Sequence, residues 1–166
     1  GTPLETSIML GLKILGFSTS AYRDSESEFD VIFFSSEGRM LGEAEGKDNK
    51  PVNIDKMRQL TMNVQEDFQK DDVNALAKGV LFGNAYRFLP LEERQDFFTE
   101  KCSTAALASN VALVKTTDLF LVAKYILESE DDNYAAECRK KILETTGLVT
   151  FPNIPVTSAE VLEKIA

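Results

Sequence analysis

A predicted β-hairpin followed by alternating helices and strands is the feature that most constrains the fold of this chain. Residues 29–34 form an apolar run and residues 39–47 mix small, apolar and charged side chains, with the turn sequence Ser-Ser-Glu-Gly between them. This pattern predicts a hairpin. The strands predicted after residue 51 are separated by helices, which is typical of parallel strands joined by crossovers. A hairpin followed by crossovers predicts a mixed sheet with helices on both faces.

The remaining elements follow from apolar periodicity and from capping residues. The predicted helices span residues 2–16, 53–68, 99–110, 119–128 and 131–146, with a short last helix opened by a capping box at 157–160. The further strands are predicted at 17–19, 80–82 and 111–114, with a brief extended piece at 149–151. We therefore expect an α/β fold with three αβα layers and a central mixed sheet of about five strands.

Local signals set the expected ends of these elements. We predict that Asn53 and Asp118 cap the second and fourth helices, and that Gly16 and Gly147 close the first and fifth. The strand at 29–34 is apolar on both of its faces. A strand with this composition is typical of the centre of a sheet covered on both sides.

Composition limits the classes of function. The chain has 166 residues, a length that suits one domain, and a net charge of −9. Such a charge argues against a general nucleic-acid coat, because phosphate binding needs basic surface. The absence of histidine excludes histidine-based nucleophilic triads and the commonest zinc ligands. Catalysis would therefore use carboxylates, Lys, Ser, Thr or Tyr.

Compartment and domain organisation give further expectations. The sequence has no apolar stretch of the roughly 20 residues that a membrane-spanning helix needs. Cys102 and Cys138 are too few and too isolated for a disulfide framework, and buried thiols in a cytoplasmic protein without membrane contact are expected. The chain starts at Gly1 instead of Met. We expect a single domain, residues 1–166, that is part of a larger protein.

Charged residues gather on one face of the strand at 39–47. Successive side chains of a strand point to opposite faces, so Glu43, Glu45 and Lys47 share one face. Asp30 lies at the head of the neighbouring predicted strand. Two carboxylates and one lysine on adjacent strands are sufficient for a metal-dependent phosphodiester hydrolase.

These residues, in this order of elements, resemble the PD-(D/E)xK nuclease superfamily, whose fold is called restriction-endonuclease-like. Four segments carry the resemblance: Leu15-Gly16-Phe17, Phe29-Asp30, Glu45-Gly46-Lys47, and Ala112-Leu113-Val114 with Thr117-Asp118-Leu119-Phe120. The resemblance covers residues 2–128 and leaves 129–166 as a C-terminal helical extension. The chain departs from the family pattern at three points, which are Phe29 where the motif has Pro, a Gly at 46, and a low isoelectric point.

The resemblance implies a chemistry for the strand residues. Asp30 and Glu45 would hold Mg²⁺ or Mn²⁺, which prefer carboxylate oxygens. Lys47 would act as a fixed positive charge on the attacking water or the scissile phosphate. The implied substrate is DNA, and a homodimer that cuts both strands is a further implication.

Each residue also has an interpretation without catalysis. Asp30 could bond a turn amide, and Glu45 with Lys47 could be an ion pair on a solvated strand edge, worth about 0–1 kcal/mol. Glu43 is either an accessory acid or an exposed strand-end charge. Glu5 is either an accessory acid on the first helix or part of a capping box.

Basic residues after the strand are candidates for phosphate contacts. Lys56 and Arg58 are the better candidates, with a solvated helix face as the alternative, whereas the helical wheel places Gln59 toward solvent. Tyr86 and Arg87 lie in a long connection, where substrate contacts are common, and packing of Tyr86 is the alternative.

Two other functions remain open at this point. The same fold could be a catalytically silent module that docks protein or nucleic acid within a larger chain, and the net charge of −9 favours that alternative. A receiver- or flavodoxin-like domain is the third, and the predicted hairpin argues against it because those folds use parallel strands joined by helices.

Overall fold

The computed structural model describes residues 3–19, 32–156, 163 and 165. Its centre is one six-stranded sheet in which the strands lie in the order of the sequence. The strands are β1 (Ser18–Thr19), β2 (Ile32–Ser35), β3 (Gly38–Gly46), β4 (Lys78–Asn84), β5 (Ala112–Lys115) and β6 (Gly147–Leu148). The longest strand, β3, and the most buried one, β4, lie at the middle of the sheet.

The pairing of neighbouring strands changes once across the sheet, from antiparallel to parallel. β1, β2 and β3 pair antiparallel, and the turn between β2 and β3 forms the predicted hairpin. β3, β4, β5 and β6 pair parallel, with Glu45 opposite Gly83 and Phe82 opposite Val114. The prediction of a mixed sheet is confirmed. Since four strands are parallel, their carboxyl ends meet at one edge.

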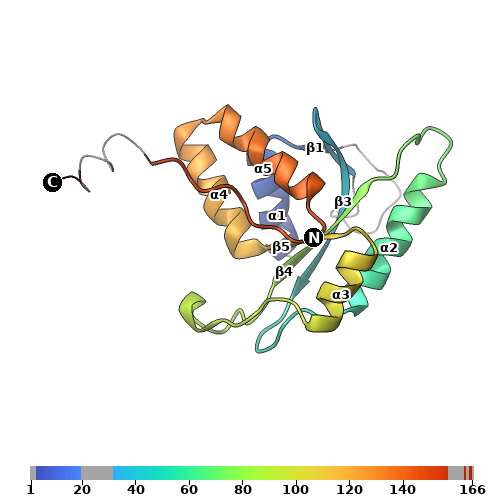
Figure 1. Ribbon diagram of the computed structural model, residues 1–166, viewed down its shortest axis with the longest axis horizontal. Helices are drawn as coiled ribbons and strands as arrows, with labels where there is room; N and C mark the ends of the chain where they lie inside the picture. Colours follow the sequence, from blue (N-terminus) through green and yellow to red (C-terminus); the bar gives the residue numbers. More distant parts are fainter. Residues whose placement is uncertain (1–2, 20–31, 157–162, 164, 166) are drawn as a thin grey trace.

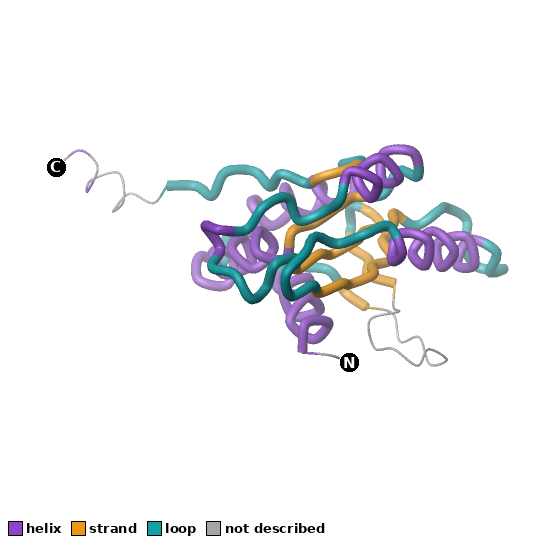
Figure 2. The backbone as a smooth tube through the Cα atoms, turned by 90° about the horizontal axis from the view of Figure 1, so that it is seen from below, coloured by secondary structure: helices purple, strands orange, loops and turns teal. Residues whose placement is uncertain are grey.

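Helices cover both faces of the sheet, which gives three layers (Figures 1 and 2). On one face lie α1 (Pro3–Ile14), α4 (Thr116–Ser129) and α5 (Asp132–Glu144), around a core that includes Phe33, Phe82 and Leu119. On the other face lie α2 (Asp55–Phe68) and α3 (Glu100–Ala108), around a smaller core that includes Leu60 and Leu81. A short 3₁₀ turn, η1 (Leu91–Glu93), lies between β4 and α3.

Three strand predictions differ from the structure. The fully buried central strand is β4, which extends two residues beyond 80–82 at each end. In β2 the side chain of Phe34 is 42% exposed, so that strand is not covered on both faces. The sixth strand starts at Gly147, before the extended piece predicted at 149–151.

The helix ends follow local chemistry at some positions and tertiary packing at others. Thr99 caps α3, because its side chain accepts a hydrogen bond of 3.1 Å from the Cys102 amide. At Gly16, with φ +104°, the amide of Phe17 bonds the carbonyl of Leu12, so the predicted end of α1 is confirmed. Asp118 does not cap α4, which starts at Thr116 immediately after β5.

Local side-chain bonds act at one further helix boundary, and pairing with the sheet sets another. Asn53 accepts a 3.2 Å hydrogen bond from the amide of Asp55, although the residue next to the helix is Ile54. α5 ends at Glu144, and Gly147, predicted to close it, belongs to β6 instead. The amide of Gly147 bonds the carbonyl of Val111, so pairing with the sheet ends the helix early.

Candidate functional site

The candidate site lies where β3 reaches the carboxyl edge of the parallel strands. Alternate residues of β3 face the two helical layers: Met40 and Ala44 pack in the core under α1 and α4, whereas Leu41 packs in the core under α2. Glu43 and Glu45 therefore face the α2 layer, as the alternation of a strand requires. The predicted common face of the charged side chains is confirmed by their ion pairs.

Four charged side chains form one cluster at this place. Lys56 of α2 lies between the two carboxylates, with its Nζ 3.3 Å from Glu43 Oε1 and 3.9 Å from Glu45 Oε2. Lys47 Nζ lies 3.2 Å from the other oxygen of Glu45. Two positive and two negative charges balance in this cluster, which we call the β3 charge cluster.

The cluster is only partly accessible to solvent. The exposed fractions of the side chains are 14% for Glu43, 18% for Glu45, 22% for Lys47 and 40% for Lys56. β3 also lies between β2 and β4, so it is not an edge strand. Glu45 and Lys47 do pair, but the interpretation of that pair as one on a solvated edge is wrong. Lys56 is likewise engaged in the cluster instead of lying on a purely solvated face.

The other predicted site residues divide into three groups. Asp30 lies outside the described residues. Glu5 lies in the first turn of α1 and is half-buried, and its neighbour Leu4 contacts the position of Gly46, where an added Cβ would be 3.4 Å from the Leu4 side chain. The absence of a side chain at residue 46 thus lets α1 approach closely. Arg58 and Gln59 are exposed on α2.

Two loops extend from the end of the site and hold each other in place. The amide of Arg87 bonds the carbonyl of Lys47 at 3.0 Å, and the amide of Phe88 bonds the carbonyl of Asp48 at 3.2 Å. The side chain of Arg87 forms an ion pair with Asp48. The connection after β4 is therefore fixed against the connection after β3, although 39 residues separate Asp48 from Arg87.

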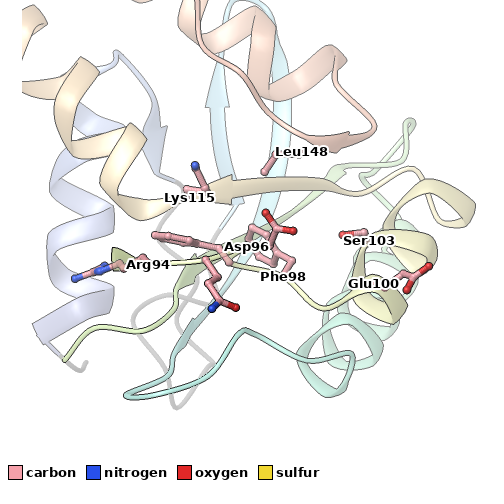
Figure 3. A pocket seen from close by; sticks show the side chains of 9 residues that line it. Arg94, Asp96, Phe98, Glu100, Ser103, Lys115 and Leu148 are labelled. Carbon is pink, nitrogen blue, oxygen red and sulfur yellow. The ribbon is translucent and has the colours of Figure 1, made fainter. Parts of the chain in front are cut away.

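An open groove lies farther along the same edge, beside the ends of β5 and β6 (Figure 3). Its volume is about 740 Å³. Asp96, Phe98, Ser103 and Leu148 are among its lining residues. The ring of Phe98 and the side chain of Val52 cover Gly83, which pairs with Glu45 in the sheet. These apolar side chains lie next to the β3 charge cluster on the side of β4.

The thiols do not contribute nucleophiles to the site. Cys102 and Cys138 are buried, and burial raises the pKa of each to about 11. The thiolate is the reactive form, so both groups are inert at neutral pH. Carboxylates and lysines remain as the reactive groups of the cluster.

Sequence reasoning missed the bridging position of Lys56 and the groove. Lys56 follows Asp55 at the start of α2, and the sequence carries no signal for the angle at which this helix crosses β3. The groove is lined by the loop at 94–98, α3, β5 and β6. The periodicity of the sequence does not predict that these segments lie side by side.

Among the described residues, no group of three or more His, Cys, Asp or Glu side chains is placed to hold a metal ion. In the same part of the chain, every helix is too short or too polar to cross a membrane. Comparison with family models, with curated proteins and with solved structures finds no significant match to this chain.

Proposed function

We propose that the chain is a metal-dependent phosphodiester hydrolase of the restriction-endonuclease-like fold, acting on DNA at the end of β3. The observation that carries this proposal is the position of Lys56 Nζ, which lies within 3.9 Å of both Glu43 and Glu45. Two carboxylates that converge on one ammonium group form a place for a single cation. The order of the elements, with a hairpin before the parallel strands, agrees with that fold.

The residues of the cluster fit a hard divalent cation. Carboxylate oxygens are the ligands that Mg²⁺ and Mn²⁺ prefer, and Mg²⁺ keeps several of its waters. Glu45 would hold the ion with Glu43 at the position that Lys56 now occupies, and Asp30, which the sequence predicts as a metal ligand, would be a further one. Lys56 is 40% exposed, so its flexible side chain can turn to solvent when another cation takes its position.

The other residues of the cluster have roles that follow from charge and burial. The bound ion would acidify a water molecule and neutralise charge on the phosphate. Lys47, held 3.2 Å from Glu45 and only 22% exposed, presents a fixed positive charge beside that position. Such a charge stabilises a phosphate more strongly where water is partly excluded. Arg58, which is exposed on the same helix as Lys56, is available to a phosphate farther along the strand of DNA.

The proposal is tested by cleavage of DNA with increasing Mn²⁺ or Mg²⁺. The wild type is expected to cut only in the presence of the metal, and Lys47→Ala is expected to lose at least about 100-fold in rate, as for other groups that stabilise transition-state charge. Lys124→Ala, at an exposed position of α4, is the matched control. Metal-independent cleavage, or unchanged cleavage by Lys47→Ala, contradicts the proposal.

A second arm measures the metal without activity. Lys56→Met keeps the apolar stem of the side chain and removes the ammonium group. If Glu43 and Glu45 converge on one cation position, this variant binds Mn²⁺ more tightly than the wild type, and Mn²⁺ raises its melting temperature. Glu45→Gln should abolish both effects. An affinity for Mn²⁺ that none of these substitutions changes would exclude the cluster as the metal site.

The charge balance of the cluster favours a second candidate, a catalytically silent module of the same fold within a larger protein. Both carboxylates are already paired with lysines, and the net charge of the chain is −9. In that case Mn²⁺ binds neither the wild type nor Lys56→Met, and docking of another domain replaces hydrolysis. The two unpaired thiols fit a cytoplasmic location for either candidate.

A further inference from the structure

The end of β3 carries an exposed aromatic side chain that the hydrolase proposal does not use. Phe88 is 69% exposed, among the highest exposures of any large apolar side chain in the described part of the protein. Its backbone is nevertheless fixed, because its amide bonds the carbonyl of Asp48. Because the backbone of the loop is already fixed, a ligand that binds the exposed ring loses little affinity to ordering of the loop.

One cationic side chain lies over this ring, and two lysines lie on the loop that holds it. The guanidinium carbon of Arg87 lies 6.0 Å from the ring centroid of Phe88. The loop that holds Phe88 in place contains Lys47 and the exposed Lys50, whose carbonyl accepts from the amide of Tyr86. Asp48 is the carboxylate between these two lysines, and it is paired with Arg87. Arg87, which lies over the ring, and the exposed Lys50 are therefore the cations that accompany the aromatic surface.

We propose that Phe88, with Arg87 and Lys50, is a stacking platform for an unpaired base of a single-stranded nucleic acid whose phosphate reaches the β3 charge cluster. Bases in a duplex are stacked on one another, whereas the bases of a single strand have open faces. Stacking on an aromatic ring with cations along the backbone is the usual way in which proteins hold single strands without reading their sequence. The inference rests on the proposed function and assigns its substrate class.

The two loops also explain why the platform is close to the site. Gly46, in the middle of the Glu45-Gly46-Lys47 sequence, lies under Arg87, whose Nη1 would be 3.1 Å from an added Cβ. The next residue, Lys47, is bonded through its backbone to β4 and to the connection after it. The carbonyl of Lys47 accepts from the amide of Arg87, and the amide of Lys47 donates to the carbonyl of Asn84. The connection that carries Phe88 is thus fixed by its backbone to the residue that follows Glu45 and Gly46.

The absence of tryptophan from the chain allows a direct test. Phe88→Trp introduces a single indole, and its fluorescence should be quenched when a single-stranded oligonucleotide binds, with duplex DNA and an abasic strand quenching much less. Phe68→Trp is the matched control, since Phe68 is 44% exposed at the far end of α2, about 18 Å of helix from Lys56. The titrations are made without a divalent metal, so that no strand is cut.

Affinity measurements complete the test. Phe88→Ala is expected to bind the single strand about 5- to 150-fold more weakly, the usual range for loss of one stacked base. Phe88→Leu, which keeps apolar bulk without a π-face, should behave like Phe88→Ala. Lys50→Ala should weaken binding and lower the salt dependence by about one counterion.

The outcomes separate this inference from the proposed function. Quenching by single strands without any metal-dependent cleavage supports the platform and contradicts hydrolysis. Cleavage with no quenching, or with equal affinity in Phe88→Ala and the wild type, overturns the platform and leaves hydrolysis standing. Equal quenching by the abasic strand also overturns it, because phosphate binding alone then accounts for the signal.

Discussion

At the scale of single residues, one partly buried ion pair joins elements that lie far apart in the sequence. Glu37, in the turn before β3, forms an ion pair with Arg139 of α5, and both side chains are 15% exposed. Arg139 also donates a 2.7 Å hydrogen bond to the carbonyl of Leu15 at the end of α1. Three segments far apart in the sequence are joined by one guanidinium group.

The pair makes stability depend on acid. Its hydrogen bond with Arg139 lowers the pKa of Glu37 to about 2 from its ordinary value of 4.5. A carboxylate whose pKa is lowered in the folded protein stabilises the fold at any pH above its pKa in the unfolded chain. This stabilisation is lost as the pH falls from about 4.5 toward 2. Glu37→Gln should therefore lower the free energy of unfolding at pH 7 by about 1–3 kcal/mol, as for loss of a charged hydrogen bond.

Urea unfolding at a series of pH values checks this expectation. The free energy of unfolding of Glu37→Gln should change less between pH 5 and pH 2 than that of the wild type. Glu128→Gln, at an exposed position of α4, should leave the curve unchanged. Parallel curves for Glu37→Gln and the wild type would show that the pair with Arg139 does not stabilise the fold.

At the scale of elements, the close approach of a covering segment to the sheet depends on glycine. An added Cβ at Gly83 of β4 would lie 2.8 Å from the ring of Phe98 and 3.1 Å from Val52. Val52 and Phe98 form an isolated parallel bridge over this strand. The covering segment and β4 therefore fit only with a residue that lacks a side chain.

Gly83→Ala should consequently destabilise the protein by about 1–3 kcal/mol through overpacking. Gly11→Ala in α1 is the control, because its Cβ would be 3.5 Å from Leu119, an ordinary contact. Alanine also favours a helix, so this control should be neutral or slightly stabilising. Thermal unfolding of both variants provides the comparison, and an unchanged melting temperature for Gly83→Ala would contradict the packing argument.

The elements also show where sequence reasoning works. Thr99 predicts the start of α3 because a capping side chain is a local signal, and it accepts from the amide of Cys102 three residues later. The early start of α4 at Thr116 has no such signal, since its preceding residue Lys115 makes no side-chain cap. Thr116 is fully buried at this start, and the burial of a residue cannot be read from the few residues next to it in the sequence.

At the scale of the whole molecule, the segment after β6 is held against the α1–α4–α5 layer. The hydroxyl of Tyr134 on α5 donates a 2.6 Å hydrogen bond to the carbonyl of Pro152. Val149 is buried, and Phe151 and Ile154 pack on the same core. The described part of the C-terminal extension therefore belongs to the fold of the domain.

Tyr134→Phe removes this hydrogen bond and keeps the ring. We expect a loss of about 1 kcal/mol in stability and faster amide exchange and proteolysis confined to residues 149–154. Hydrogen-exchange mass spectrometry measures the effect, with Tyr86→Phe, on the opposite side of the sheet, as the control. Equal exchange in residues 149–154 of Tyr134→Phe and the wild type would show that packing alone holds the segment.

The sequence by itself determined the elements, the mixed direction of the sheet and the common face of Glu43 and Glu45, because hydrophobic period, capping and strand alternation are local properties. Only the tertiary structure decided that Lys56 bridges these carboxylates, that β4 is the central buried strand, and that the backbone of Phe88 is bonded to Asp48. Each of these depends on how segments far apart in the chain pack together. That geometry is set by how the two cores pack, and each core is built from residues of many elements.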